Sequence, residues 1–251
     1  MTARNAHPAL RTLSTVADVA AISGDDAIAC WAAQRLGNGG AAHAYRDAVA
    51  VVAPELNRWD RLIVRGPVED AVELVARLIP GLPHGYRVQG AAHVIRAALE
   101  RIPQLDPLNE FGWMETTTCI SGPIGSVAWL DDDAYAEAAE LVTRVYPTSY
   151  AVPGVSPEQR WAAVRGADGR LAAVAADACT GGGVGFIAGV VTDTHARGAG
   201  HGRAVTAFVT KELLAQHGRV ALVVDSDNDV AISLYRRLGY TFETIAAARV
   251  S

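Results

Sequence analysis

The chain has 251 residues, half of them hydrophobic, and a formal net charge of −5. This length allows one large domain or two small ones, and the composition supports a buried core and argues against disorder. The negative charge, without a basic tract, argues against a nucleic acid as partner. The three cysteines are far apart and form no CxxC pattern, so we expect no metal site. No run reaches the roughly 18 apolar residues of a membrane span, so we expect a cytoplasmic protein that does not engage a membrane.

The first half of the chain has the alternating pattern of an α/β domain. Apolar periodicity predicts helices over 25–36, 68–79 and 91–101, and strands over 48–52, 61–64, 86–89 and 115–120. The glycine-rich segment 37–40 follows a helix and is therefore interpreted as a turn, not a phosphate cradle. Pro67 stands near the first turn of the helix that follows it, where proline is favoured.

The second half shows stronger signals. Strands are predicted over 126–130, 161–165, 170–176, 184–192, 219–224 and 240–247, and helices over 135–145, 202–216 and 229–237. A hairpin turn is expected over 166–169. The acidic triplet Asp131, Asp132 and Asp133 precedes a helix, and we favour helix capping over metal binding for it.

These elements predict two domains, over residues 1–120 and 121–251. The order strand, helix, strand, helix, strand occurs over 61–120 and again over 184–247. Two interpretations stay open: the N-terminal half is a diverged, degenerate copy of the C-terminal one, or it is an unrelated smaller α/β domain. If the halves are related, only the second keeps a ligand site, because the first has Gly66 and Pro67 where the second has a glycine-rich loop.

That loop, residues 197–203, lies between the strand over 184–192 and a helix. Three glycines there allow close backbone approach, and the N–H groups and dipole of a helix start suit a pyrophosphate. A P-loop is excluded because the loop has no lysine. A dinucleotide fold is disfavoured because Arg203 occupies the place of the third glycine, although Asp225 lies about where a ribose-binding acid would stand.

A second segment indicates which kind of ligand the loop would bind. Arg197, Gly200 and Gly202 fit [QR]xxGx[GA], and the later segment fits NxxAxxLYxxxG[FY] at Asn228, Ala231, Leu234, Tyr235, Gly239 and Tyr240. Together these motifs resemble the GNAT acyltransferase superfamily. The stretch over 224–240 most resembles its glycine N-acyltransferase-like branch, whose members carry an extra N-terminal domain. From about Ser126 onward, the resemblance implies a mixed, mostly antiparallel GNAT sheet flanked by helices.

The resemblance also assigns roles. Backbone groups of the strand before the loop would pair with the pantetheine arm of coenzyme A, and Asn228 would contact the same part of the ligand. Tyr235 would protonate the departing thiolate, which is chemically reasonable because a phenol has a pKa near 10 and a thiol near 8.5. A backbone N–H around Val191 is the candidate oxyanion donor. The implied cofactor-binding residues are Val190, Val191, Thr192, Arg197, Gly198, Ala199, Gly200, His201, Gly202, Arg203 and Asn228.

Two features depart from the superfamily. The strand segment 185–189 has no acidic residue where many relatives place a general base. Asp177, Asp193 and Asp225 remain as candidates, with Asp225 slightly preferred and a water chain equally plausible. The chain also stops too early for the usual final strand, so either the 115–120 segment or a partner subunit in a homodimer must protect that sheet edge.

The function predicted is acyl-CoA-dependent N-acyl transfer, with acetyl-CoA as cosubstrate and a small-molecule or peptide amine as acceptor. The amine would attack the thioester directly, since no GxSxG or Cys/His nucleophile motif is evident. One alternative is a non-catalytic acyl-CoA-binding or regulatory module. Another is aminoacyl transfer from charged tRNA, against which the net charge argues. The sequence does not identify the acceptor.

Overall fold

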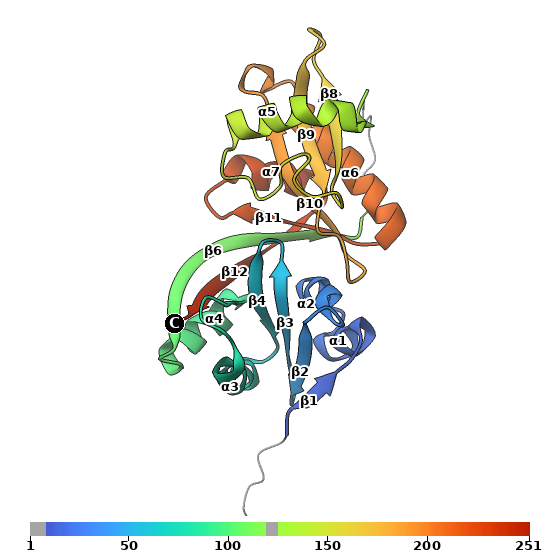
Figure 1. Cartoon of the computed structure of the whole chain (residues 1–251). Helices are drawn as coiled ribbons and strands as arrows, with labels where there is room; N and C mark the ends of the chain where they lie inside the picture. The colour runs from blue at the N-terminus through green and yellow to red at the C-terminus, as the bar shows by residue number, and fades with distance from the viewer. Residues whose placement is uncertain (1–8, 119–124) are drawn as a thin grey trace, which may run out of the picture. The chain divides into compact units, whose positions relative to one another are not determined.

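The computed structural model describes residues 9–118 and 125–251, which form two compact units (Figure 1). Unit 1 comprises Met1–Phe111 and Thr244–Ser251, and unit 2 comprises Gly112–Glu243. The sequence placed a boundary after residue 120, nine residues beyond this division. It did not predict that the last eight residues return to the first unit. Strands β6 and β12 each contribute residues to both units.

Unit 1 contains a sheet with the strand order β1-β2-β3-β4-β5-β12-β6. Strands β4 and β5 are parallel and joined by helix α3, while the pairs β1–β2, β2–β3, β3–β4 and β5–β12 are antiparallel. The elements are β1 (Arg11–Leu13), α1 (Val16–Ser23), α2 (Ala27–Ala32), β2 (Ala41–Tyr45), β3 (Ala48–Leu56), β4 (Trp59–Arg65), α3 (Val68–Leu78), β5 (Arg87–Ala91), α4 (Ala92–Arg101), β6 (Leu105–Thr116) and β12 (Thr241–Val250).

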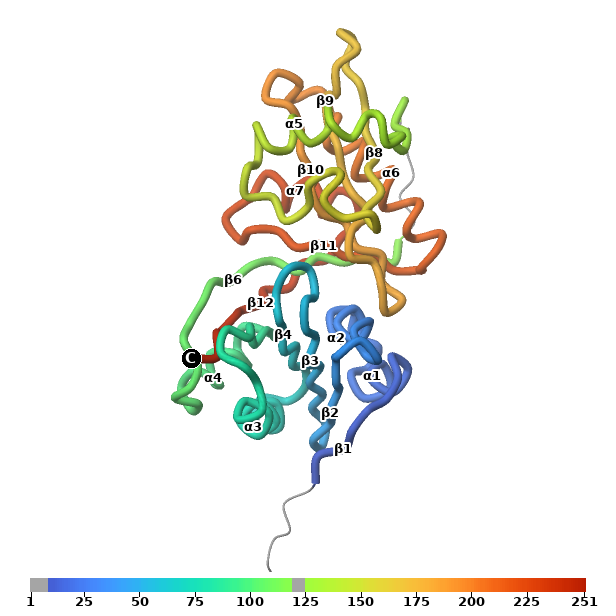
Figure 2. The backbone as a smooth tube through the Cα atoms, in the orientation of Figure 1, coloured from blue at the N-terminus to red at the C-terminus, as the bar shows by residue number. Residues whose placement is uncertain are grey.

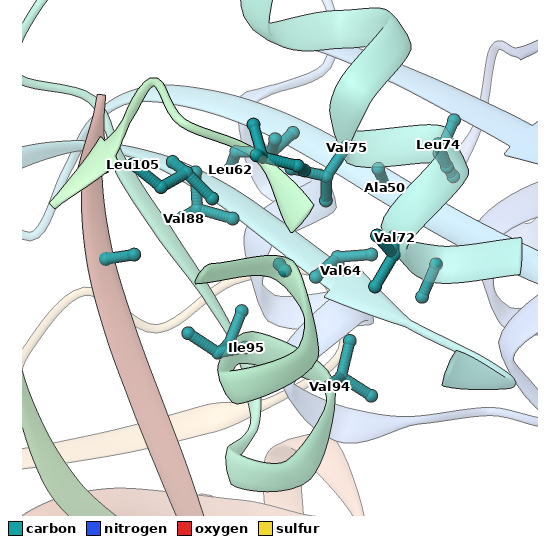
Figure 3. Packing of buried hydrophobic residues seen from close by; sticks show 14 of the residues in the cluster. Ala50, Leu62, Val64, Val72, Leu74, Val75, Val88, Val94, Ile95 and Leu105 are labelled. Carbon is teal, nitrogen blue, oxygen red and sulfur yellow. The ribbon is translucent and has the colours of Figure 1, made fainter. Parts of the chain in front are cut away.

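The core of unit 1 forms where α3 and α4 pack on one face of this sheet (Figure 3). Leu74 and Val75 of α3 and Ile95 of α4 are fully buried against Leu62 and Val88 of the parallel strands. Burying an aliphatic side chain of this size contributes about 1.5–3 kcal/mol. Helix α3 has the apolar spacing of a surface helix with one buried face, which is the pattern that predicted it from sequence.

Unit 2 contains a sheet with the order β12-β6-β11-β10-β9-β8-β7. Strands β7 to β10 pair antiparallel, and β10 pairs with β11 in parallel. The prediction of a mixed, mostly antiparallel sheet flanked by helices is confirmed. The further elements are β7 (Ala128–Trp129), α5 (Tyr135–Val145), β8 (Arg160–Arg165), β9 (Leu171–Asp177), β10 (Gly185–Thr192), α6 (His201–His217), β11 (Val220–Asp225) and α7 (Asp229–Arg237).

Helices cover both faces of the unit 2 sheet (Figures 1 and 2). On one face, side chains of α6 and α7 join Ile187, Leu222 and Val224 in one hydrophobic cluster. On the other face, α5 packs over Trp161 and Val174 in a second cluster. The parallel strands β10 and β11 therefore lie in the middle of a three-layer arrangement.

Strand β6, which precedes unit 2 in the chain, lies between β11 and β12 in the strand order. The edge of β11 is thus covered by a strand from the first half of the chain, which is the alternative that the sequence placed at 115–120. The strand begins ten residues earlier than predicted, and residues 119 and 120 lie outside the described ranges. Strand β12, the last strand of the second half, pairs with β5 of the first half through Ile245–Arg249. The last strand of each half is therefore part of the other half's sheet.

Several local predictions were wrong. The helix expected over 25–36 is the short α2 followed by a 3-10 turn over Ala33–Arg35, and β1, α1 and β2 were not predicted. Helix α1 begins at a capping box formed by Thr15 and Asp18, a signal that the sequence contained. The acidic triplet 131–133 does not cap α5 through its side chains: a 3-10 turn over Asp132–Ala134 intervenes, and Ala134 is the N-cap.

We expect Ile245→Ala to lower the free energy of unfolding by about 2–5 kcal/mol, because this fully buried side chain on β12 leaves a cavity when truncated. Arg249→Ala on the same strand removes a half-exposed ion pair with Asp106 and should cost at most about 1 kcal/mol. Urea denaturation of the two variants measures the difference. Equal losses would show that β12 is not part of the folded core.

Candidate functional site

Strands β10 and β11 are paired over only three residues each. The register joins Gly185–Ile187 to Val220–Leu222, and the pairing ends there. On its other side β10 contains a bulge, because Ala188 and Val191 face Ala176 and Val174 of β9, which leaves one extra residue in β10. A bulge bends its strand, so the last part of β10 is directed away from β11 and an opening forms between them.

Glycine is required at the centre of this bulge. Gly189 has a φ of +61°, a left-handed conformation that other residues rarely adopt. A Cβ at this position would stand 2.4 Å from the Trp161 ring of β8. The sequence analysis did not single out Gly189 or Trp161. A glycine inside an apolar strand is a known sign of a bulge, and this signal was present in the sequence.

The predicted pantetheine contacts lie on the bent part of β10. The Asp193 N–H donates to the Ala172 carbonyl in β9 at 2.9 Å. Backbone groups of successive strand residues point to opposite sides, so those of Val191 also point toward β9. Those of Val190 and Thr192 point toward the opening. The donor for a ligand carbonyl is therefore better placed on Val190 or Thr192 than on Val191, where the sequence suggested it.

The glycine-rich loop leads from this opening into α6. Gly198 and Gly200 have φ values of +81° and +82°, and Gly200 is the N-cap of α6 without a side-chain cap. The first backbone N–H groups of a helix have no partner within it, so this 17-residue helix presents several donors and its positive dipole end at an exposed loop. This is a suitable site for a phosphate or pyrophosphate.

Gly202 brings three elements together at the start of α6. It is buried, and a Cβ there would stand 2.6 Å from Thr192 Oγ1 at the end of β10 and 3.9 Å from the Leu234 side chain of α7. The loop, the bent strand and α7 therefore meet at one point. The start of α6 therefore lies beside Leu234 of the second motif, although the two motifs are far apart in the sequence.

Helix α7 supplies Asn228 and Tyr235. Asn228 is the N-cap, and its Oδ1 accepts a hydrogen bond from the Ala231 N–H at 3.1 Å, so the capping role is present and the amide nitrogen remains for a ligand. Tyr235 is 7% exposed, and its ring centre lies 6.0 Å from that of Tyr240. Burial, and to a smaller extent the nearby Tyr146, raise the pKa of Tyr235 well above its usual value. The phenol is neutral at physiological pH.

The structure separates the three candidate bases. Asp177 is engaged by Arg160 at 2.9 Å and by the hydroxyl of Thr180. Asp193 accepts from the His195 N–H and pairs with Arg144, interactions that lower its pKa. Both carboxylates therefore have structural roles.

Asp225 is exposed at the end of β11, and within the described ranges no ion pair or hydrogen bond holds its carboxylate. Of the three, it is the one that lies on a strand bordering the opening. The two arginines at the end of α7 have partners within the protein. Arg236 stacks on Phe242, and Arg237 donates to the Ser233 hydroxyl.

The parallel strands β4 and β5 of unit 1 show no opening like the one between β10 and β11. A Cβ on Gly90 of β5 would stand 2.6 Å from the Val64 carbonyl of β4, so these two parallel strands stay close where β10 and β11 have separated. Helix α3 begins after Pro67 with two acidic residues in its first turn. Acidic residues at a helix start repel an anion, so unit 1 offers no comparable phosphate site.

Comparisons with known proteins agree with this geometry. Residues 165–249 match the family model described as FR47-like protein. A GCN5-related N-acetyltransferase from Sphaerobacter thermophilus is 18% identical with a TM-score of 0.58, covering 96% of this chain and 94% of that one. One from Kribbella flavida is 18% identical with a TM-score of 0.53, covering 81% and 86%. A Drosophila protein has a TM-score of 0.62 at 10% identity, covering 96% and 98%. No curated protein matched the sequence.

The chain thus has the fold of the GNAT acetyltransferases, and its C-terminal part carries the matching family segment. The prediction of the GNAT fold is confirmed. Over residues 9–118 and 125–251, no group of His, Cys, Asp and Glu side chains is arranged to hold a metal ion. No helix in that part of the chain is long and apolar enough to cross a membrane.

We expect Gly202→Ala to weaken the binding of acetyl-CoA at least tenfold, because the added methyl group displaces Thr192 or the start of α6. The double variant Gly202→Ala/Thr192→Ala removes the hydroxyl that clashes and should recover most of the affinity. Calorimetric titration with acetyl-CoA measures both. Identical affinity of the double and single variants would show that this contact does not shape the loop.

Proposed function

We propose that the protein is an acyl-CoA-dependent N-acyltransferase that transfers an acetyl group from acetyl-CoA to an amine. The observation that carries the proposal is the opening between β10 and β11, which leads directly to the uncapped start of α6. Coenzyme A consists of a long amide-containing arm attached to a pyrophosphate. The unpaired backbone of β10 suits the arm, and the N–H groups over 198–203 suit the pyrophosphate.

The reaction proceeds by direct attack. The amine nitrogen forms a bond to the thioester carbon, and the carbonyl oxygen gains negative charge, which a backbone N–H of Val190 or Thr192 stabilises. The C–S bond then breaks, and the sulfur receives a proton from Tyr235. The nitrogen loses its surplus protons, for which Asp225 is the nearest carboxylate on the strands bordering the opening, and the phenolate recovers its proton from solvent.

The energetics define what Tyr235 contributes. With ordinary pKa values near 10 and 8.5, moving a proton from a phenol to a thiolate is uphill by about 2 kcal/mol. Burial raises the pKa of Tyr235 further, and burial raises that of a bound thiol as well. The phenol therefore acts first as a hydrogen-bond donor to the developing thiolate, and the transfer is completed as the sulfur leaves its low-dielectric site.

We also infer that unit 1 is a diverged copy of the catalytic unit. Both halves run through an antiparallel meander, a crossover helix to a parallel strand, a second helix and a last strand. Together with the segment over 224–240, this arrangement supports placement in the glycine N-acyltransferase-like branch. Unit 1 would then have a structural role, since the connection from β4 to α3 has no glycine-rich loop to bind a phosphate.

A second function is favoured by one observation. Strand β10 has no acidic residue, so a module that binds acyl-CoA without transferring the acyl group would show the same opening and the same loop. Calorimetric binding of acetyl-CoA without release of free thiol in the presence of a broad panel of amines would favour this alternative.

We expect Tyr235→Phe to lower kcat about a hundredfold, which is in the range for loss of a general acid, while the acetyl-CoA affinity stays within twofold. Tyr240→Phe is the matched control: it removes a buried phenol that bonds to Thr210 at 2.8 Å and should leave kcat nearly unchanged. Thiol release at saturating amine measures both. Equal turnover of Tyr235→Phe and the unmodified protein would remove Tyr235 from the mechanism.

A further inference from the structure

The segment between α5 and β8 lies over the bent end of β10. Arg144 in the last turn of α5 pairs with Asp193, directly after β10, at 2.9 Å. Farther along, the Cβ of Ala151 lies 3.3 Å from where a Cβ on Gly189 would stand, so the segment rests on the bulge itself. These two contacts place residues 146–150 beside the site where a thioester carbonyl would lie.

This segment presents apolar side chains to solvent from a fixed backbone. Ser149 is buried, and its hydroxyl donates to the Ala151 carbonyl at 2.7 Å. Tyr146 and Tyr150 on either side of it are 37% and 45% exposed, and Val223 on β11 is 41% exposed. Large apolar groups that gather on the surface around an opening are typical of a ligand-binding site.

A negative charge borders the same surface. Asp225 follows Val223 by two residues on β11, so both side chains emerge on one face of the strand. Val220, Leu222 and Val224 pack toward α6 and α7, so Val223 and Asp225 emerge on the face of the sheet that α5 covers, and Tyr146 directly follows α5. Partial burial, and then the charge of Asp225, raise the pKa of Tyr146. The exposed carboxylate thus lies at the end of β11, from which the chain enters α7 and reaches Tyr235.

We propose that Tyr146, Tyr150, Val223 and Asp225 form the acceptor site, and that the acceptor is a primary amine joined by a short linker to an aromatic or branched apolar group. This proposal rests on the function proposed above and names its substrate class. The apolar group packs on the tyrosine rings and Val223, and the ammonium group pairs with Asp225.

The proton balance of this site is complete. The ammonium gives one proton to the Asp225 carboxylate, and the neutral amine attacks the thioester carbon. The new C–N bond forms, the C–S bond breaks, and Tyr235 protonates the sulfur. The nitrogen releases a second proton to solvent, and the proton held by Asp225 returns through solvent to Tyr235. The products are the N-acetylated amine and coenzyme A.

The charges around the site also exclude a class of acceptors. Asp225, Asp227 and Asp229 are all exposed at the end of β11 and the start of α7. A carboxylate on the acceptor would be repelled by them. An α-amino acid should therefore be a much poorer acceptor than the amine with the same side chain.

Three amines test the site: 2-phenylethylamine, ethylamine, which lacks the ring, and phenylalanine, which adds a carboxylate. We expect kcat/KM for 2-phenylethylamine to exceed those of both others at least tenfold. Tyr146→Ala should lower kcat/KM for 2-phenylethylamine about tenfold and leave kcat/KM for ethylamine and the acetyl-CoA affinity nearly unchanged. Asp225→Asn should lower kcat/KM for both amines. Val155→Ala, in the same loop and 76% exposed, is the control and should change neither.

Equal kcat/KM for 2-phenylethylamine and ethylamine, or an unchanged preference in Tyr146→Ala, would overturn the acceptor assignment and leave the acetyltransferase function standing. A preference for phenylalanine over 2-phenylethylamine would overturn the role of Asp225. Absence of both acetyl-CoA binding and thiol release would instead reject the proposed function, and the acceptor site with it.

Discussion

The opening between β10 and β11 depends on one steric constraint: the contact of Gly189 with the Trp161 ring. Because glycine alone fits this contact and this backbone conformation, β10 takes an extra residue and turns away from β11 after Ile187. The candidate site follows from that turn. The strand end is released from its neighbour, the loop begins beside it, and Thr192 is carried against Gly202 at the start of α6.

Each half of the chain contributes one strand to the sheet of the other half. The β11 edge is covered by β6, and β12 pairs with β5. A strand edge without a partner invites aggregation, and here the first half of the chain protects the second. In unit 1 the parallel strands remain close at Gly90, and proline with acidic residues replaces the glycine loop.

The sequence predicted the features that are local and missed those that depend on distant contacts. Helices α5 and α7 were predicted with the observed bounds, because their periodicity lies within one segment. Motif spacing singled out the loop and Tyr235 as candidates. The position of β6 could not be predicted, since strand pairing is set by residues far apart in the chain. The exposed Tyr146 was missed for a related reason: a tyrosine at the end of a helix has the same pattern whether it is buried or faces solvent.

Binding of acetyl-CoA in this opening of unit 2 underlies every role assigned above. A crystal structure of the protein with bound acetyl-CoA tests it most directly. We expect the pyrophosphate on the backbone N–H groups over 198–203, the pantetheine arm along Val190 and Thr192, and the sulfur within hydrogen-bond distance of the Tyr235 hydroxyl. A pyrophosphate bound at the start of α3 in unit 1, or a sulfur remote from Tyr235, would contradict it.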